Sequence, residues 1–147
     1  MASGLNHRNV WSVYDVGQSE DGTDYIAMEY LVGETVSRLS RRLSKTKRTS
    51  PLLVAQIIAD ACEGLHAAHE LRGPNGEPME VVHRDVTPSN IYVCYDGSVR
   101  IVDFGIAKAA NKLHQTRAGQ LKGKMSYVSP EQFEHKADRR ADVWSLG

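Results

Sequence analysis

Two apolar runs rich in β-branched and aromatic residues open the chain, and a turn separates them. Residues 10–17 (VWSVYDVG) and 25–31 (YIAMEYL) flank the turn sequence EDG at 20–22. This pattern is typical of two antiparallel strands. We expect residues 1–9 to form the last turn of a helix, and the VGE sequence at 32–34 to break the second strand. The first part of the chain therefore predicts a small β-sheet.

The middle of the chain has the apolar spacing of helices. Residues 36–48 predict a short helix with a basic, solvated tail. Ser50 belongs to the residue types that cap helices, and Pro51 suits a first helical turn. The apolar positions that follow recur at helical spacing: Val54, Ile57, Ile58, Ala61, Leu65 and Ala68. We therefore expect a long helix from about residue 50 to residue 69, and residues 138–147 begin another.

Two further apolar runs predict a β-hairpin in the second half of the chain. Residues 91–95 (IYVCY) and 98–102 (SVRIV) are short, rich in β-branched residues and joined by Asp96 and Gly97. An Asp-Gly pair between two such runs is the strongest short-range signal for a hairpin. The hairpin brings the loop before its first strand beside the loop after its second strand.

Three polar side chains lie on these two loops. Because the hairpin brings its ends together, we expect Asn90 and Asp103 to converge. An amide oxygen and a carboxylate suit Mg²⁺, which takes oxygen ligands and shares its coordination sphere with phosphates. Asp85 is then available to receive a proton or to orient a hydroxyl group.

Composition narrows the class of protein. The chain has 147 residues, of which 41% are hydrophobic and 24% charged, as in one ordinary globular domain. Eighteen basic and eighteen acidic residues cancel, so no net field indicates a nucleic-acid or membrane partner. No segment has the pattern of a signal peptide or a membrane span. We therefore expect a cytoplasmic protein.

The cysteines and two of the histidines carry no clear chemistry of their own. Cys62 and Cys94 lie in apolar contexts without a CxxC partner, so we expect two buried, reduced thiols. His66 and His69 have a spacing that could bind a metal ion, but we expect no cysteine or carboxylate to complete a ligand set with them. We expect these histidines to be solvated or to cap the helix.

Several motifs in order resemble the catalytic half of the protein kinases. They are HRD at 83–85 followed by Asn90, DFG at 103–105 and SPE at 129–131. The wording around them resembles bacterial members of the eukaryotic-type serine/threonine kinases. The resemblance implies an α+β, partial kinase-like fold, with the end of the small lobe and the hinge in 1–31 and the first half of the mainly helical large lobe in 32–147.

The resemblance also implies a reaction and its cofactors: transfer of the ATP γ-phosphate to protein hydroxyls, with ATP and Mg²⁺. Asp85 would accept or orient the substrate hydroxyl, and Asn90 and Asp103 would hold Mg²⁺. The adenine site would be formed by Met28 as gatekeeper, the backbones of Glu29 and Leu31, and Tyr92 where the family usually has a leucine.

Further positions match structural and regulatory residues of the family. Val13, His83 and Phe104 match members of a stacked hydrophobic spine, and Asp142 matches the residue that anchors the backbone near the HRD motif. Thr116 is the expected phosphosite of the activation segment, with the Arg84 side chain as the clamp for its phosphate.

Departures from the family pattern leave alternatives open. The usual catalytic-loop lysine is Thr87, and Lys124 follows Gly123 where a threonine is usual, so these two residue types look exchanged and both are candidate catalytic residues. The alternative is a plain loop threonine and a solvated lysine.

The 147 residues also contain no glycine-rich loop and no strand lysine, so we expect a fragment of a kinase domain with low activity by itself. A non-catalytic fragment or pseudokinase, binding a partner or itself through exposed core, is the alternative. A small-molecule phosphotransferase is disfavoured by the SPE motif at 129–131.

Overall fold

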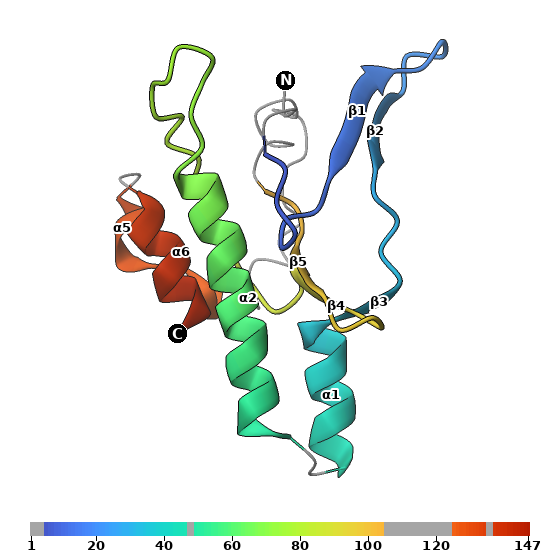
Figure 1. Ribbon diagram of the computed structural model, residues 1–147, viewed down its shortest axis with the longest axis vertical. Helices are drawn as coiled ribbons and strands as arrows, with labels where there is room; N and C mark the ends of the chain where they lie inside the picture. The colour runs from blue at the N-terminus through green and yellow to red at the C-terminus, as the bar shows by residue number, and fades with distance from the viewer. Residues whose placement is uncertain (1–4, 47–48, 105–124, 135–136) are drawn as a thin grey trace.

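The computed structural model describes residues 5–46, 49–104, 125–134 and 137–147 (Figure 1). It contains a two-stranded sheet, a three-stranded sheet and several helices. Figure 1 shows the long helix α2 running through the molecule, with α6 on one side and α1 on the other, while the two-stranded sheet stands apart from the three-stranded one.

The two-stranded sheet is the antiparallel pair expected from the sequence, but its strands are shorter. β1 (Val13–Gln18) pairs with β2 (Asp24–Met28) through a turn in which Gly22 has a φ of 83°. β1 starts three residues later than expected because Val10 forms a parallel bridge with Ile101 in the other sheet. The chain therefore turns from one sheet to the other just before β1.

The expectation of a helical turn at residues 1–9 is wrong for residues 5–9, and residues 1–4 lie outside the described part. The Val10 N–H donates to the His7 carbonyl at 3.0 Å, which closes a turn. Asn9 is buried, and its Nδ2 donates to the Val99 carbonyl at 3.0 Å. This buried amide bond ties the segment to the strand of Val99, so the backbone cannot continue as a helix.

The three-stranded sheet has the order β3–β4–β5 and contains the expected hairpin. β4 (Ile91–Cys94) and β5 (Val99–Ile101) pair antiparallel, and Gly97 in their turn has a φ of 87°. β3 (Gly33–Thr35) pairs with β4, although we expected these residues only to end the preceding strand. A side chain at Gly33 would collide with the Val93 carbonyl, so glycine permits this close pairing.

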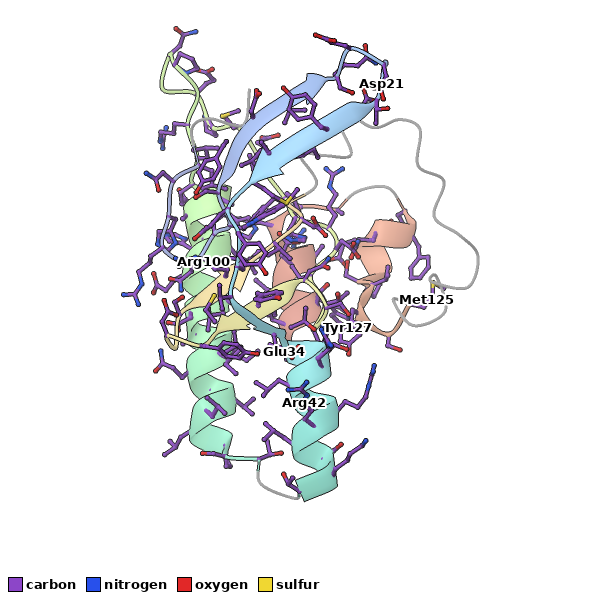
Figure 2. All side chains as sticks on the ribbon, turned by 90° about the vertical axis from the view of Figure 1, so that its right-hand side faces the viewer. Asp21, Glu34, Arg42, Arg100, Met125 and Tyr127 are labelled. Carbon is purple, nitrogen blue, oxygen red and sulfur yellow. The ribbon has the colours of Figure 1, made fainter. Side chains whose placement is uncertain are left out.

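Three helices, α1, α2 and α6, follow the predicted pattern, whereas the short elements η1 and α5 were not predicted. α1 (Val36–Thr46) begins directly after β3, and Glu34 forms ion pairs with Arg38 at 3.1 Å and Arg42 at 3.2 Å on this helix (Figure 2). α2 (Pro51–His69) has Ser50 in the N-cap position, although the serine side chain makes no capping hydrogen bond. The remaining elements are the 3₁₀ turn η1 (Met125–Tyr127), α5 (Pro130–Phe133) and α6 (Arg139–Leu146).

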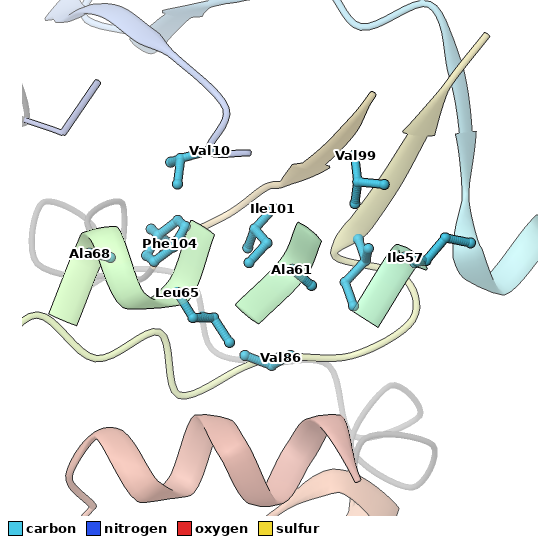
Figure 3. Packing of buried hydrophobic residues seen from close by; sticks show 10 residues of the cluster. Val10, Ile57, Ala61, Leu65, Ala68, Val86, Val99, Ile101 and Phe104 are labelled. Carbon is cyan, nitrogen blue, oxygen red and sulfur yellow. The ribbon is translucent and has the colours of Figure 1, made fainter. Parts of the chain in front are cut away.

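The core lies between α2 and the three-stranded sheet (Figure 3). Its buried apolar side chains come from the segment before β1, from α2, from the loop before β4, and from β4, β5 and the residues after them: Val10, Ile57, Ala61, Leu65, Ala68, Val86, Ile91, Val99, Ile101 and Phe104. The stripe on α2 is the one expected from its apolar spacing. The core therefore joins both loops that carry the candidate chemistry.

The expectation of two buried thiols is wrong for Cys62, which is exposed on α2, while Cys94 is partly buried. Cys62 follows the buried Ala61 by one residue and so faces away from the apolar stripe. Among the described residues, no helix is both long and apolar enough to cross a membrane.

Candidate active site

The loop between residues 83 and 90 is closed by hydrogen bonds from Asn90. The Asn90 side-chain amide donates to the Asp85 carbonyl at 2.8 Å and approaches the Asp85 carboxylate, Oδ2, at 3.3 Å. Its backbone N–H donates to the Thr87 carbonyl at 2.9 Å. Asn90 and Thr87 are buried, whereas Asp85 is partly buried. Asn90 therefore fixes the position of the carboxylate that is the candidate base.

Asn90 also connects this loop to the segment that follows β5. The Val102 N–H donates to the Asn90 carbonyl at 2.9 Å, so the main chain of Asn90 lies beside the residue that precedes Asp103. Asp103 is exposed and has a φ of 60°. Residues other than glycine adopt this left-handed backbone conformation only at a cost in conformational free energy. The hairpin thus places Asn90 and Asp103 at the same end of the sheet, as its turn predicted.

These side chains have the chemistry to hold Mg²⁺. The Asn90 amide nitrogen is engaged with Asp85, which leaves its Oδ1 atom as an oxygen donor, and the exposed Asp103 carboxylate supplies another. No group of three or more His, Cys, Asp or Glu side chains suited to a metal occurs in the part that the structure describes. An amide and a carboxylate fit a cation that takes its remaining ligands from phosphates and water.

His83 is a buried, neutral ring at the centre of the site. Its Nε2 lies 2.9 Å from the Val102 carbonyl and its Nδ1 lies 3.2 Å from the Asp85 N–H. A carbonyl only accepts and a backbone N–H only donates, so Nε2 carries the proton and Nδ1 accepts. Burial lowers the pKa of His83 below its usual value, against the opposing effects of the Val102 carbonyl and Asp142.

The ring of His83 packs on Phe104. Their centroids are 4.7 Å apart, with the ring planes inclined by 57°. Val13, which was expected to extend this stack, is only partly buried and is not in the hydrophobic core cluster. Of the expected hydrophobic spine, the His83–Phe104 contact is therefore present among the described residues, whereas Val13 is not part of the core cluster.

Asp142 on α6 anchors the same loop from the other side, which confirms its expected role. Its fully buried carboxylate accepts the His83 N–H at 2.9 Å and the Arg84 N–H at 2.8 Å. The His69 Nε2 lies 2.8 Å from the Asp142 Oδ2 atom, so the ring donates a third hydrogen bond. A carboxylate with three donors is well satisfied despite its burial.

The expectation of a solvated or capping His69 was wrong, although it is correct that His66 is exposed. The sequence does contain a signal for this difference. His69 follows the buried Leu65 by four residues, so it continues the apolar stripe of α2 toward α6. His66 follows Leu65 by one residue and points away from the stripe.

Arg84 has a left-handed backbone with a φ of 63° and an exposed side chain. It lines a cavity of about 600 Å³ together with Arg139 and Arg140. Its carbonyl accepts from the Gln132 Nε2 at 2.9 Å, which joins α5 to the loop. Gln132 has no counterpart among the residues singled out from the sequence.

The expected adenine residues lie along the connection from β2 to β3 and on β4. Met28 ends β2 with an exposed side chain, and Glu29 follows it. Leu31 is partly buried, as is Tyr92, which pairs with Thr35 in β3 and with Arg100 in β5. Trp11 was not among the residues expected here, yet its indole Nε1 donates to the Glu29 carbonyl at 2.8 Å.

Three expected residues lie outside the described part of the chain: Gly105 of the DFG motif, the candidate phosphosite Thr116, and Lys124. The proposed exchange between Thr87 and Lys124 therefore stays a prediction, as does the pairing of Arg84 with a phosphate on Thr116.

The family model and the similar proteins all indicate the same family. The model of the protein kinase domain matches residues 1–147. The chain is 46% identical to the tyrosine-protein kinase MasK of Myxococcus xanthus, with all of this chain and 23% of the relative covered. It is 38% identical to the serine/threonine-protein kinase PknB of Mycobacterium leprae, covering 99% of this chain and 22% of the relative.

A probable serine/threonine-protein kinase of Clostridium acetobutylicum, CA_C1728, is 36% identical over 99% of this chain and 20% of its own length. The chain thus spans less than a quarter of the length of these curated relatives. The chain belongs to the protein kinase family.

Proposed function

We propose that this chain is the catalytic-loop part of a Mg²⁺-dependent protein kinase that transfers the ATP γ-phosphate to serine or threonine hydroxyls. The observation that carries the proposal is the double connection of Asn90. Its side chain bonds Asp85 at 2.8 Å and its carbonyl bonds Val102 at 2.9 Å, so the candidate base and the two candidate metal ligands share one rigid unit.

Each of the three side chains has a separate task in this proposal. Asp85 orients the acceptor hydroxyl and takes its proton, because its carboxylate is held by the loop yet only partly buried. Asn90 and Asp103 hold Mg²⁺ through oxygen atoms. Bound Mg²⁺ and ATP supply the phosphoryl group and the charge that neutralises its oxygens.

The same unit is positioned from behind by buried groups. His83 donates to the Val102 carbonyl and accepts from the Asp85 N–H, and Asp142 holds the backbone of His83 and Arg84. These contacts fix the loop before substrate arrives, which favours catalysis by position and charge.

The nucleotide base is assigned to the segment after β2. Met28 stands at the end of the strand, the backbones of Glu29 and Leu31 supply polar groups, and Tyr92 on β4 supplies an apolar face. The partly buried Tyr92 takes the place that the family usually gives to a leucine.

The relatives include a protein named a tyrosine kinase as well as proteins named serine/threonine kinases. Thr87 stands where the serine/threonine class usually has a lysine. The acceptor is therefore to be determined by phosphoamino-acid analysis of the labelled product.

The experiment measures transfer of label from γ-labelled ATP to a peptide library. The protein is a version that is extended before residue 1 by a glycine-rich loop and strand lysine from a relative. Asp85→Asn is expected to lower the rate at least about 1000-fold, since it removes the proton acceptor. Asp96→Asn, in the exposed turn of the hairpin, is the matched control and keeps the rate. An Asp85→Asn protein as fast as the control overturns the proposal.

The 147 residues alone are expected to transfer phosphate slowly, because the sequence contains no glycine-rich loop or strand lysine to hold the phosphates. Rapid label transfer by the pure, monodisperse 147-residue chain, lost in Asp85→Asn, would contradict this expectation.

Exposed apolar side chains favour a second candidate, a module that associates with a partner or with itself. Phe133 on α5 and Val143 and Trp144 on α6 are each more than half exposed. Sedimentation velocity is expected to show concentration-dependent association that Val143→Ser weakens. A monomer at all concentrations would exclude self-association.

A further inference from the structure

Glu29, the first residue after β2, is held at each of its polar groups. Its N–H donates to the Ser12 carbonyl at 2.9 Å, and its carbonyl accepts the Trp11 indole N–H at 2.8 Å. Its carboxylate accepts the Ser12 N–H at 3.4 Å and lies 3.7 Å from the Arg100 guanidinium. The orientation of this residue is therefore set by its neighbours before any ligand binds.

Trp11 is itself anchored to the strand that leads to Asp103. Its backbone N–H donates to the Ile101 carbonyl at 3.0 Å, and the preceding residue, Val10, is buried and bridges to Ile101. Arg100, which pairs with the Glu29 carboxylate, belongs to the same strand, β5 (Figure 2). Trp11 and Arg100 thus connect the candidate base-binding segment to the candidate metal ligand through β5.

The indole bond restricts what the Glu29 carbonyl can do. A carbonyl oxygen has two lone pairs, and the Trp11 N–H uses one of them. The peptide group between Glu29 and Tyr30 cannot rotate without losing this bond. The remaining lone pair stays in place as an acceptor, and the Tyr30 N–H is kept on the opposite side of the planar peptide group.

We propose that Trp11 is a positioning residue that holds the Glu29 carbonyl as a hydrogen-bond acceptor and thereby selects adenine over hypoxanthine nucleotides. The inference rests on the proposed function, which places the base at this segment. Adenine offers an exocyclic amine, a donor, to the held carbonyl. Hypoxanthine has a carbonyl oxygen at the same ring position, so two acceptors would face each other.

The test compares ATP with inosine triphosphate, which carries hypoxanthine, by calorimetric titration in Mg²⁺. The wild-type 147-residue chain is expected to prefer ATP. Trp11→Phe keeps a large aromatic ring but lacks the N–H, so the ATP affinity is expected to fall about three- to tenfold. The ratio of ATP to inosine triphosphate affinity falls with it. Trp144→Phe, on the exposed side of α6, is the matched control and keeps both values.

A second measurement uses the protein's own fluorescence. The chain has two tryptophans, so Trp144→Phe leaves Trp11 as the only one. Addition of ATP is expected to change the emission of this single-tryptophan protein. The calorimetric titration has a substitute if circular dichroism shows that Trp11→Phe does not fold. A benzothienylalanine at position 11 replaces the indole N–H by sulfur at nearly constant volume, and this protein is then titrated instead.

The outcomes separate this inference from the proposed function. A wild-type chain that binds neither nucleotide overturns both the nucleotide site and the role of Trp11. A Trp11→Phe protein that binds ATP with an unchanged affinity ratio overturns the inference alone. Equal losses for the two nucleotides also overturn it, because they indicate packing by the ring rather than orientation of the carbonyl.

Discussion

The buried Asp142 carboxylate accepts the backbone N–H of His83 at 2.9 Å across 59 residues of sequence. Because it also accepts the adjacent N–H of Arg84, one side chain on α6 determines the backbone path of the candidate catalytic loop. The left-handed conformation of Arg84 is held directly at this anchor. Stability and activity are therefore expected to depend on the same carboxylate.

Asp142→Asn is expected to destabilise the fold by about 3 kcal/mol. An asparagine offers one acceptor oxygen, so its NH₂ group would face a backbone N–H or the ring nitrogen that the carboxylate now satisfies. Urea denaturation followed by circular dichroism measures the change. Asp96→Asn is the control, since Asn-Gly serves a hairpin turn as well as Asp-Gly does. Equal urea midpoints for Asp142→Asn and Asp96→Asn would contradict the proposed anchoring role of Asp142.

Stability is expected to fall as the pH is lowered from 7 toward 5, in part because of His83. Its pKa is lowered in the folded protein by burial. Below the ordinary histidine pKa of about 6.5, the unfolded chain takes up a proton that the folded ring resists, so acid favours unfolding. The loss begins near that value and levels off below the folded pKa. His83→Asn should flatten this part of the denaturation profile, whereas the exposed His66→Asn should leave it unchanged.

Asn90→Ala and Asn90→Asp separate the two tasks of Asn90. Both variants lose the hydrogen bond from the amide to the Asp85 carbonyl. Each is therefore expected to lower the free energy of unfolding by about 1–2 kcal/mol, measured as a lower melting temperature. Only the aspartate keeps an oxygen ligand for Mg²⁺, but it adds a negative charge beside Asp85. Calorimetric titration with Mg²⁺ and ATP is expected to detect binding to Asn90→Asp and not to Asn90→Ala. Full binding by the alanine variant would exclude Asn90 as a metal ligand.

Thr116 is expected to carry a phosphate in the active form of a longer protein. It is the only hydroxyl residue between Gly105 and Gly123. Arg84 is exposed beside Arg139 and Arg140, although Arg139 is paired with Glu70 and Arg140 with Asp138. Phosphopeptide mapping of active protein is expected to find phosphate at Thr116, with Arg84→Met removing its effect on the rate. An active protein without this phosphate would exclude the assignment.

Lys124 and Thr87 are expected to have exchanged the ammonium and hydroxyl roles found in the serine/threonine kinases. Thr87 is buried in the loop of Asp85, so its position is compatible with a hydroxyl near the carboxylate. Lys124→Met, made in the extended protein used for the label-transfer assay, is expected to lower the rate by about 100-fold because a cation is lost near the transferred phosphate. Lys122→Met is the control, and an unchanged rate in Lys124→Met means that the exchange is wrong.

The sequence predicted the elements whose signals are local. The apolar stripe of α2 and the Asp-Gly turn of the hairpin each lie within one element, and both are present. β3 was missed because its three residues have no apolar period and pair with a strand that occurs much later in the chain. β1 starts late for a similar reason, since Val10 is taken into a bridge with Ile101.

The candidate site shows the same division. The HRD and DFG motifs could be found by spacing, and the hairpin placed Asn90 beside the segment of Asp103. The indole of Trp11 gave no signal, because a tryptophan in a β-rich run is unremarkable until the Glu29 carbonyl is seen to lie 2.8 Å from its N–H. Contacts between distant segments decide such roles, and no single-sequence period reports them.

The close approach of Asn9 to α2 has a consequence for how the molecule opens. A side chain at Gly64 would lie 2.6 Å from the Asn9 carbonyl oxygen, and that carbonyl accepts the Ile101 N–H at 2.9 Å. The helix, the segment before β1 and β5 must therefore separate together, as one cooperative unit. The tip of the β1–β2 hairpin has no such attachment among the described residues, so its amides should exchange with solvent deuterium by local fraying, well before the amide of Ile101, which exchanges only when this unit unfolds.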